Sequence, residues 1–281
     1  MYYKFDVCVM LPSRGRTDSL TNSITTILDK AKNPDKICLA LGFDDDDQIG
    51  IDYFVKSVKP MLDQRGAHYK ALTFKRMGYD AINRYYNELG NNVHAEWYFL
   101  WNDDATMITQ DWDEVIVRET GNFALLKVHT HNEHPYSIFP IIPQRWLNHL
   151  GYFSRHQMID AELSQNAYML DIIKIVDIEV QHDQSELTGT NDATSMAKRR
   201  FEGNPSDPRD FHNQNILVQR LNDCVSLANL MKEKGLSTEF FENIVAGKQD
   251  PWEKLKLNDI NKQMVQFQLS RPQSPIAATL T

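Results

Sequence analysis

The sequence predicts an α/β fold in which helices flank a mostly parallel sheet. The first observation is an apolar and aromatic run at 96–101, which has the composition of a strand buried on both faces. The second is that three more apolar runs precede it, separated by segments with helical spacing of their apolar residues. Alternating strands and helices favour a parallel sheet with right-handed crossovers. The expected strands are 7–11, 37–43, 68–74 and 96–101, and the expected helices follow at 17–28, 48–64 and 77–89.

The alternation loosens after Asp104. We expect strands at 123–128 and 172–180, an extended proline-containing segment at 135–143, and helices at 145–150 and 158–170. The polar stretch 183–215 has the length of a functional loop or lid. Two helical segments, 213–234 and 237–266, form a helical C-terminal extension. The expected division is a first domain at 1–190, a lid loop and helical extension at 191–268, and a disordered tail at 269–281.

Composition restricts the possible partners. The 281 residues include 42% hydrophobic residues, enough for a large core, and carry a net charge of −8. An acidic protein does not attract nucleic acid through its overall charge. Its three cysteines are widely spaced and form no disulfide framework or zinc pattern. Since the sequence shows no signal peptide and no apolar run of the ~20 residues that span a bilayer, we expect a soluble, cytoplasmic protein.

Two adjacent carboxylates, Asp103 and Asp104, end the run at 96–101. Ligands of open α/β sheets bind outside the carboxyl ends of the strands. Paired acids at that edge are suited to a divalent cation that also binds a phosphate. The alternative is an ordinary turn, because Asn and Asp are common turn formers.

Several landmarks occur in a characteristic order. The first strand is followed by Leu11-Pro12-Ser13-Arg14-Gly15-Arg16, the second ends on Asp44-Asp45-Asp46-Asp47, and the fourth ends on Asn102-Asp103-Asp104. Gly151-Tyr152-Phe153 then precedes Ile159-Asp160-Ala161-Glu162-Leu163, and His182 follows the last strand. Over residues 5–183 this series resembles the GT-A glycosyltransferases, especially those of family 2. The resemblance implies a GT-A, Rossmann-like catalytic domain that binds a nucleotide sugar.

The resemblance implies a metal site. Asp104 is the first candidate ligand, Asp103 the second, and His182 occupies the place of the late histidine ligand of many GT-A enzymes. Carboxylates, phosphate oxygens and an imidazole suit Mn²⁺ or Mg²⁺ better than zinc. Asn102 stands where the strict motif has an acid, which leaves the number of protein ligands open. The alternative for His182 is a surface histidine at the start of a loop.

The resemblance also implies a catalytic base. Asp160 matches the family's proton acceptor, whereas Ile159 replaces the first acid of that motif, and Glu162 is a neighbouring candidate. A carboxylate within hydrogen-bond reach can take the proton of the attacking hydroxyl. Family 2 enzymes invert the anomeric centre. The alternative is that both acids belong to the first turn of a helix, where the helix dipole favours them.

Nucleotide binding is expected at the ends of the first strands, with UDP as the expected nucleotide. Arg14 and Arg16 are candidates for contacts with the base or the diphosphate, because arginine binds oxygen pairs in a bidentate manner. The alternative is that these charges are only solvated. The full candidate set is Pro12, Ser13, Arg14, Arg16, Asp44, Asp45 and Asp103.

The acceptor is the least determined part. Trp146 is a candidate for stacking on a sugar, although an aromatic residue in a short helix is more often part of the core. Lys198, Arg199 and Arg200 form a basic patch that would suit a nucleic-acid acceptor, such as a hydroxymethylated DNA base, or would simply be solvated. A glycan or a small molecule are the other acceptors.

Two further functions remain open. A sugar-nucleotide nucleotidyltransferase has a similar sheet, but it usually carries a glycine-rich turn with a basic residue after the first strand, where this chain has only Gly15. A non-catalytic module that binds a nucleotide sugar or a glycan would use the same strand ends. Loss of turnover on substitution of Asp160, with binding retained, would distinguish the enzyme from the module.

Overall fold

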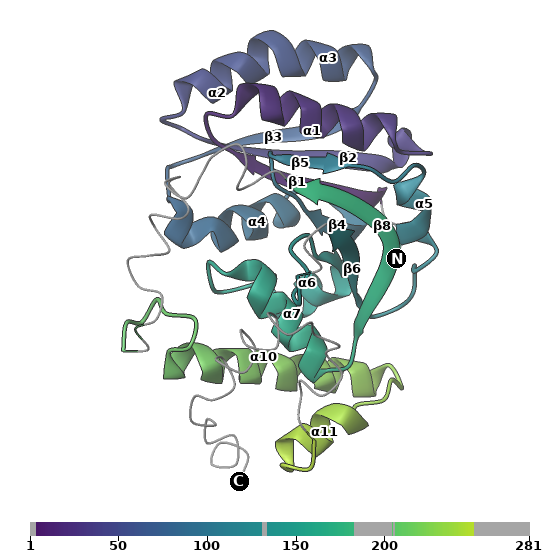
Figure 1. Ribbon diagram of the computed structural model, residues 1–281, viewed down its shortest axis with the longest axis vertical. Helices are drawn as coiled ribbons and strands as arrows, with labels where there is room; N and C mark the ends of the chain where they lie inside the picture. The colour runs from purple at the N-terminus through teal and green to yellow at the C-terminus, as the bar shows by residue number, and fades with distance from the viewer. Residues whose placement is uncertain (1–3, 131–133, 183–203, 205, 250–281) are drawn as a thin grey trace.

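The computed structural model describes residues 4–130, 134–182, 204 and 206–249. Within these residues eight strands form one sheet in the order β3-β2-β1-β4-β7-β6-β8-β5 (Figure 1). The first half is parallel: β1 pairs with β2 and β4, and β2 pairs with β3. In the second half β7 runs antiparallel to β4 and β6, β8 is parallel to β6, and β5 is antiparallel to β8. The predicted sheet flanked by helices is therefore confirmed, with a parallel first half and a mixed second half.

The elements of the first half agree with the predicted order. The long helix expected at 48–64 is present as two α-helical segments joined by a π-helical turn, Phe54–Val58. The helix expected at 77–89 begins with a 3-10 turn and becomes α-helical at Ile82. The bounds are β1 Phe5–Ser13, α1 Thr17–Asp29, β2 Ile37–Asp44, α2 Gln48–Tyr53, α3 Lys59–Gln64, β3 His68–Phe74, α4 Ile82–Asn91 and β4 Ala95–Leu100.

The second half contains a strand and a helix that the sequence pattern did not predict: β5 and α5 directly follow the paired acids. β5 is only three residues long, too short to show a period of its own. The bounds are β5 Ala105–Met107, α5 Trp112–Val117, β6 Leu125–Thr130, β7 Ile141–Pro143, α6 Gln144–Leu150, α7 Ile159–Met169, β8 Ile173–His182, α10 Gln214–Glu233 and α11 Glu239–Val245.

Helices cover both faces of the sheet, so the central strands are buried on both sides (Figure 1). Successive residues of β1 face opposite layers. Val7 and Val9 pack in the layer that contains α1 and α5, whereas Cys8 and Met10 pack in the layer that contains α4, α6 and α7. This double burial explains why the strands are continuous apolar runs.

The described part of the C-terminal extension packs on the second of these layers. In Figure 1, α10 crosses below α6 and α7, and α11 lies beside α10. Leu221, Cys224 and Leu227 of α10 belong to the same buried cluster as Leu163 of α7 and Trp146 of α6. The segment beyond residue 249, which includes the expected tail, lies outside the described residues. Every helix in the described parts of the chain is too short or too polar to cross a membrane.

Candidate functional site

The carboxyl ends of β1, β2 and β4 meet at one edge of the sheet and bring the predicted polar residues together. β1 lies between the other two strands and is parallel to both. Met10 is the last residue of β1 that pairs with β4. Pro12, which has no amide hydrogen, follows it, so its presence removes no hydrogen bond from that pairing. Beyond it, Ser13 faces the end of β4, and Gly15 adopts a positive φ of 67° in the turn to α1.

Asp103 and Asp104 are buried and bound by residues of the first turn. The Ser13 hydroxyl donates to Oδ2 of Asp103 at 2.7 Å. Nη1 of Arg16 lies 3.1 Å from Oδ1 of Asp103 and 2.7 Å from Oδ2 of Asp104. A single guanidinium therefore contacts both acids and offsets one of their two negative charges, which lowers the cost of burying them.

The two acids differ in protonation. Burial raises the pKa of Asp103 to about 6, against the opposing effects of Arg16 and Ser13. For Asp104, burial also favours the neutral form, but the neighbouring His182 and Arg16 outweigh it and hold the pKa below its ordinary value. Asp104 is therefore the more acidic of the two and loses its proton at a lower pH than Asp103.

His182 reaches the acids through β5. β5 starts directly after Asp104 and pairs antiparallel with β8, and Ala105 faces His182 in that register. Nε2 of His182 consequently lies 3.2 Å from Oδ1 of Asp104. The Phe139 ring packs edge-on against the imidazole at 5.1 Å and limits its rotation. The structure thus brings together two predicted metal ligands that are 78 residues apart in the chain.

The residues fit a divalent cation in one specific respect. Oδ1 of Asp104 is buried and has no hydrogen-bond donor, although the imidazole nitrogen is close to it. Both oxygens of Asp103, in contrast, are engaged by Ser13 and Arg16. Among the described residues no group of three or more His, Cys, Asp and Glu side chains forms a complete metal site. Asp104 and His182 would therefore be the protein ligands, and oxygens of a bound nucleotide or water would supply the others.

The run of four aspartates after β2 has a separate contact for each member. Asp44 accepts hydrogen bonds from Tyr85 and from Arg14 at 2.9 Å, and Asp46 binds the same arginine. Asp45 accepts from the Arg76 amide at 3.1 Å. Asp47 caps α2 through the Gly50 amide at 3.1 Å and also binds the Gly15 amide at 2.8 Å. Asp44 and Asp47 are buried at the junction of the first two strand ends, whereas Asp45 and Asp46 are exposed.

Asp160 lies on the first turn of α7 and is partly exposed. Asp160 and the paired acids are linked electrostatically through Tyr86, a buried residue of α4. Burial raises the pKa of Tyr86, and the charges of Asp103, Asp104 and Asp160 raise it further. The Tyr86 hydroxyl donates to the Trp101 carbonyl at 2.8 Å and lies 3.1 Å from Oδ1 of Asn102. The charges of Asp160 and of the paired acids therefore act on the same tyrosine.

Glu162 occupies a different environment from Asp160. Its side chain is buried, with 1% of its surface exposed. The carboxylate accepts hydrogen bonds from the Ser154 hydroxyl and from the His156 amide at 3.0 Å. Burial raises the pKa of Glu162 despite these donors. Both sets of contacts are with the loop that precedes α7.

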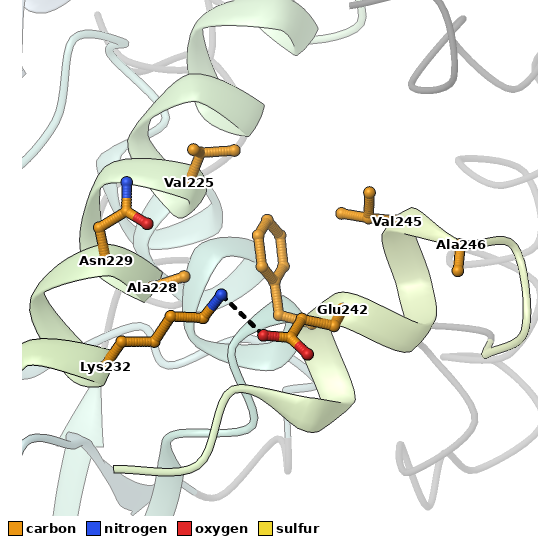
Figure 2. Close-up of a pocket in the computed structure, with 8 residues that line it drawn as sticks. Val225, Ala228, Asn229, Lys232, Glu242, Val245 and Ala246 are labelled. Carbon is orange, nitrogen blue, oxygen red and sulfur yellow. Dashed lines mark ion pairs between the residues drawn. The ribbon is translucent and has the colours of Figure 1, made fainter. Parts of the chain in front are cut away.

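The structure contradicts the acceptor role predicted for Trp146. Its ring has no exposed surface and packs against Phe123 in the core, so neither face is available to a sugar. Lys198, Arg199 and Arg200 lie outside the described residues. A groove of about 240 Å³ lies between α10 and α11 and is lined by residues such as Val225, Phe241 and Val245 (Figure 2). It contains none of the predicted site residues.

Sequence reasoning did not identify Tyr85 and Tyr86 as members of the site. They were interpreted as apolar positions of a helix, and both are indeed buried. Their hydroxyls, however, contact Asp44 and Asn102. The available signal was the tyrosine type itself, because the phenol oxygen of a buried tyrosine needs a polar partner.

Comparison with known proteins supports the fold. No protein-family model matches the chain, and no curated protein matches it in sequence. The mannosyltransferase PcManGT from Pyrobaculum calidifontis, solved with GDP-Man and Mn²⁺, is similar in structure with a TM-score of 0.54 and 11% identity, over 95% of this chain and 85% of that chain. S. aureus TarS residues 1–349, solved with UDP, gives a TM-score of 0.49 and 11% identity, over 78% and 71% of the two chains. The chain thus has a glycosyltransferase fold of the GT-A type.

Proposed function

We propose that this chain is a metal-dependent, inverting glycosyltransferase that moves a sugar from a nucleotide sugar, with UDP as the nucleotide, to an acceptor hydroxyl. One observation carries the proposal. Asp104 and His182 converge at the carboxyl edge of a GT-A sheet, and Oδ1 of Asp104 has no hydrogen-bond donor there. Residues 1–190 would hold this machinery.

The residues divide into a donor side and an acceptor side. Arg14, Asp44 and Asp45 lie at the ends of β1 and β2, where they would bind the nucleoside. Arg16 would face the diphosphate, because a guanidinium binds phosphate oxygens in the same bidentate manner as carboxylates. Mn²⁺ or Mg²⁺ held by Asp104 and His182, with Asp103 beside them, would neutralise the charge that develops on the leaving diphosphate.

Asp160 is the proton acceptor in this proposal. It takes the proton of the acceptor hydroxyl while the hydroxyl oxygen forms a bond to the anomeric carbon. The bond from that carbon to the phosphate oxygen breaks, and the nucleoside diphosphate leaves with its electron pair. Asp160 suits this role better than Glu162, since Asp160 is partly exposed and Glu162 is buried under its own loop.

The test is a donor screen. The full chain is incubated with UDP-, GDP-, CDP- and dTDP-sugars, with and without Mn²⁺, and release of nucleoside diphosphate is measured. We expect release from one donor, loss of release with EDTA, and faster release once an acceptor is supplied from sets of glycans, small molecules and hydroxymethylated DNA. Metal-dependent binding of a nucleotide sugar without any turnover would favour the non-catalytic module. Failure of every nucleotide to bind would disprove the proposal.

A further inference from the structure

We propose that the C-terminal segment 206–224 positions Asp160, and that Glu162 is the positioning residue at the centre of this arrangement. The inference rests on the proposed function and deepens it, because it gives the C-terminal extension a role in the same site. It also changes the role of Glu162 from a candidate proton acceptor to a group that fixes the loop leading to the proton acceptor.

The first part of the argument is the contacts of Glu162 within its own loop. Its carboxylate binds the Ser154 hydroxyl and the His156 amide, so it holds the chain at the positions eight and six residues before it. Nδ1 of His156 accepts a hydrogen bond from the Met158 amide at 3.1 Å. These bonds fix the chain immediately before the first turn of α7, which carries Asp160.

The second part is the contact with the C-terminal segment. Nε2 of His156 and Nε2 of Gln157 each lie 2.9 Å from the carbonyl oxygen of Arg209. At the other end of the loop, the Tyr152 hydroxyl donates to Oδ1 of Asp223 on α10 at 2.6 Å. The C-terminal segment therefore holds the loop on both sides of Ser154, and it does so through buried polar groups whose loss is costly.

The third part connects the loop to the paired acids. Nδ2 of Asn83 and Nδ2 of Asn87, both on α4, donate to the Ser154 carbonyl at 3.2 and 2.8 Å. The same helix carries Tyr86, which contacts Asn102 beside Asp103. The loop is thus fixed between α4, which contacts the strand end with the acids, and the C-terminal segment. Asp160 follows the loop, so its distance from the acids depends on both supports.

Direct proton transfer through Glu162 conflicts with this geometry. A general base must come within hydrogen-bond reach of the hydroxyl it deprotonates. Glu162 is buried and its donors are groups of its own loop, whereas Asp160 is partly exposed on the same turn. A displacement of a catalytic group by 1 Å costs roughly 10² in rate, which makes such a support catalytically important without contact to substrate.

The test compares Glu162→Gln with Glu162→Ala. Both bonds go to Oε2 of Glu162, so the amide oxygen of Gln at that place can still accept from the Ser154 hydroxyl and the His156 amide, and we expect turnover within about threefold of wild type. Glu162→Ala removes the oxygen that accepts both bonds, and we expect kcat to fall roughly 10–100-fold while KM for the donor stays within about twofold. Amide hydrogen exchange should become faster in peptides covering 153–160 of the Ala variant.

Two further variants complete the design. Glu242→Ala is the matched control, because Glu242 is an exposed acid of α11 whose partners are Lys232 at 2.8 Å and Thr238, and neither belongs to the loop. It should leave turnover and exchange of residues 153–160 unchanged. Ser154→Ala removes one hydroxyl only and should reproduce a weaker form of the Glu162→Ala effect, which keeps the test valid if Glu162→Ala does not fold.

The outcomes are distinct. If Glu162→Gln is as inactive as Glu162→Ala, then Glu162 itself transfers the proton and the inference is wrong. Unchanged kcat and unchanged exchange in both Glu162→Ala and Ser154→Ala would also overturn it. Absence of turnover in the wild-type protein would contradict the proposed function alone, since hydrogen exchange would still decide whether Glu162 fixes the loop.

Discussion

Nε2 of His182 lies 3.2 Å from Oδ1 of Asp104, and that buried oxygen has no hydrogen-bond donor. The pair arises because β5 begins at Ala105, which faces His182 across the antiparallel ladder. A divalent cation between the two atoms would give the carboxylate oxygen a partner and use the imidazole lone pair. The proposed metal site can therefore be tested directly, by replacing Asp104 and measuring metal binding.

We expect Asp104→Asn to weaken Mn²⁺ binding by at least about tenfold. Replacing a residue that only hydrogen-bonds to a metal ligand already lowers metal affinity by about 10–100-fold. Titration of free Mn²⁺ by electron paramagnetic resonance measures this without any substrate. Asp52→Asn is the control, since Asp52 is an exposed acid of α2 that pairs with Lys56 at 2.7 Å. Equal Mn²⁺ affinity of the two variants would remove Asp104 from the site.

Nucleotide binding should depend on Arg14. Arg14 binds Asp44 at 2.9 Å at the junction of the first two strand ends, and about two fifths of its side chain is exposed. We expect Arg14→Ala to weaken UDP binding in the presence of Mn²⁺ by about tenfold, which corresponds to one charge-assisted hydrogen bond of about 1.4 kcal/mol. Calorimetry measures it, with Arg65→Ala as the control, because Arg65 pairs with Asp29 away from this edge. Equal losses in the two variants would speak against a nucleotide at Arg14.

Asp160→Asn should separate binding from turnover. The substitution keeps the size of the side chain and removes its proton acceptor, and loss of general-base catalysis typically costs about 10²–10⁴ in rate. UDP affinity with Mn²⁺ should stay within about twofold, because the donor residues lie on other elements. Asp35→Asn is the control, because Asp35 is an exposed acid in the 3-10 turn Pro34–Lys36. A variant that transfers sugar at the wild-type rate would refute the role of Asp160.

The parallel half of the fold could be predicted because three of its strands, β1, β2 and β4, are mostly buried and read as apolar runs. The order of the landmarks also predicted Asp104 and His182 as neighbours. β5, which brings those two residues together, could not be predicted, because three residues carry no detectable period. The positions of Glu162 and Trp146 were equally hidden, since burial depends on tertiary packing and both residues occur in helices where an exposed or a buried side chain fits the pattern.

The contact between α4 and the loop before α7 leads to a stability prediction. A Cβ built on Gly90 would lie 2.4 Å from Cε2 of Phe153, whose ring is buried and packs edge-on against Tyr98. Gly→Ala in a helix usually stabilises by about 0.5–1 kcal/mol, but overpacking costs about 1–3 kcal/mol. We therefore expect Gly90→Ala to destabilise, measured as the midpoint of urea unfolding. Glu88→Ala, at an exposed position of α4, should show no such loss; stabilisation by Gly90→Ala would contradict the tight packing.

His156 leads to a prediction about pH. Burial lowers its pKa to about 4, aided by the charge of Arg220 and opposed by the Arg209 carbonyl and Asp210. The unfolded chain, with an ordinary value of about 6.5, therefore binds more protons between pH 4 and 6.5. The stability that neutral His156 contributes is fully present above about pH 6.5 and is lost as the pH falls toward 4. A shift of about 2.5 pKa units corresponds to at most about 3 kcal/mol.

The measurement is the free energy of unfolding of wild type and His156→Gln from pH 4 to 7.5. Because glutamine does not titrate, the difference between the two curves isolates His156 from Glu162, whose raised pKa acts in the opposite direction as the pH rises. We expect the variant to be the less stable protein at pH 7.5, because glutamine cannot keep both the bond from the Met158 amide and the bond to the Arg209 carbonyl. The difference in the free energy of unfolding between the two proteins should become smaller below about pH 6.5. Protonation of Nδ1 of His156 removes the bond from the Met158 amide in the wild-type protein. Parallel curves would mean that His156 titrates alike in the folded and unfolded chains, and that its buried contacts with the C-terminal segment are not maintained in solution.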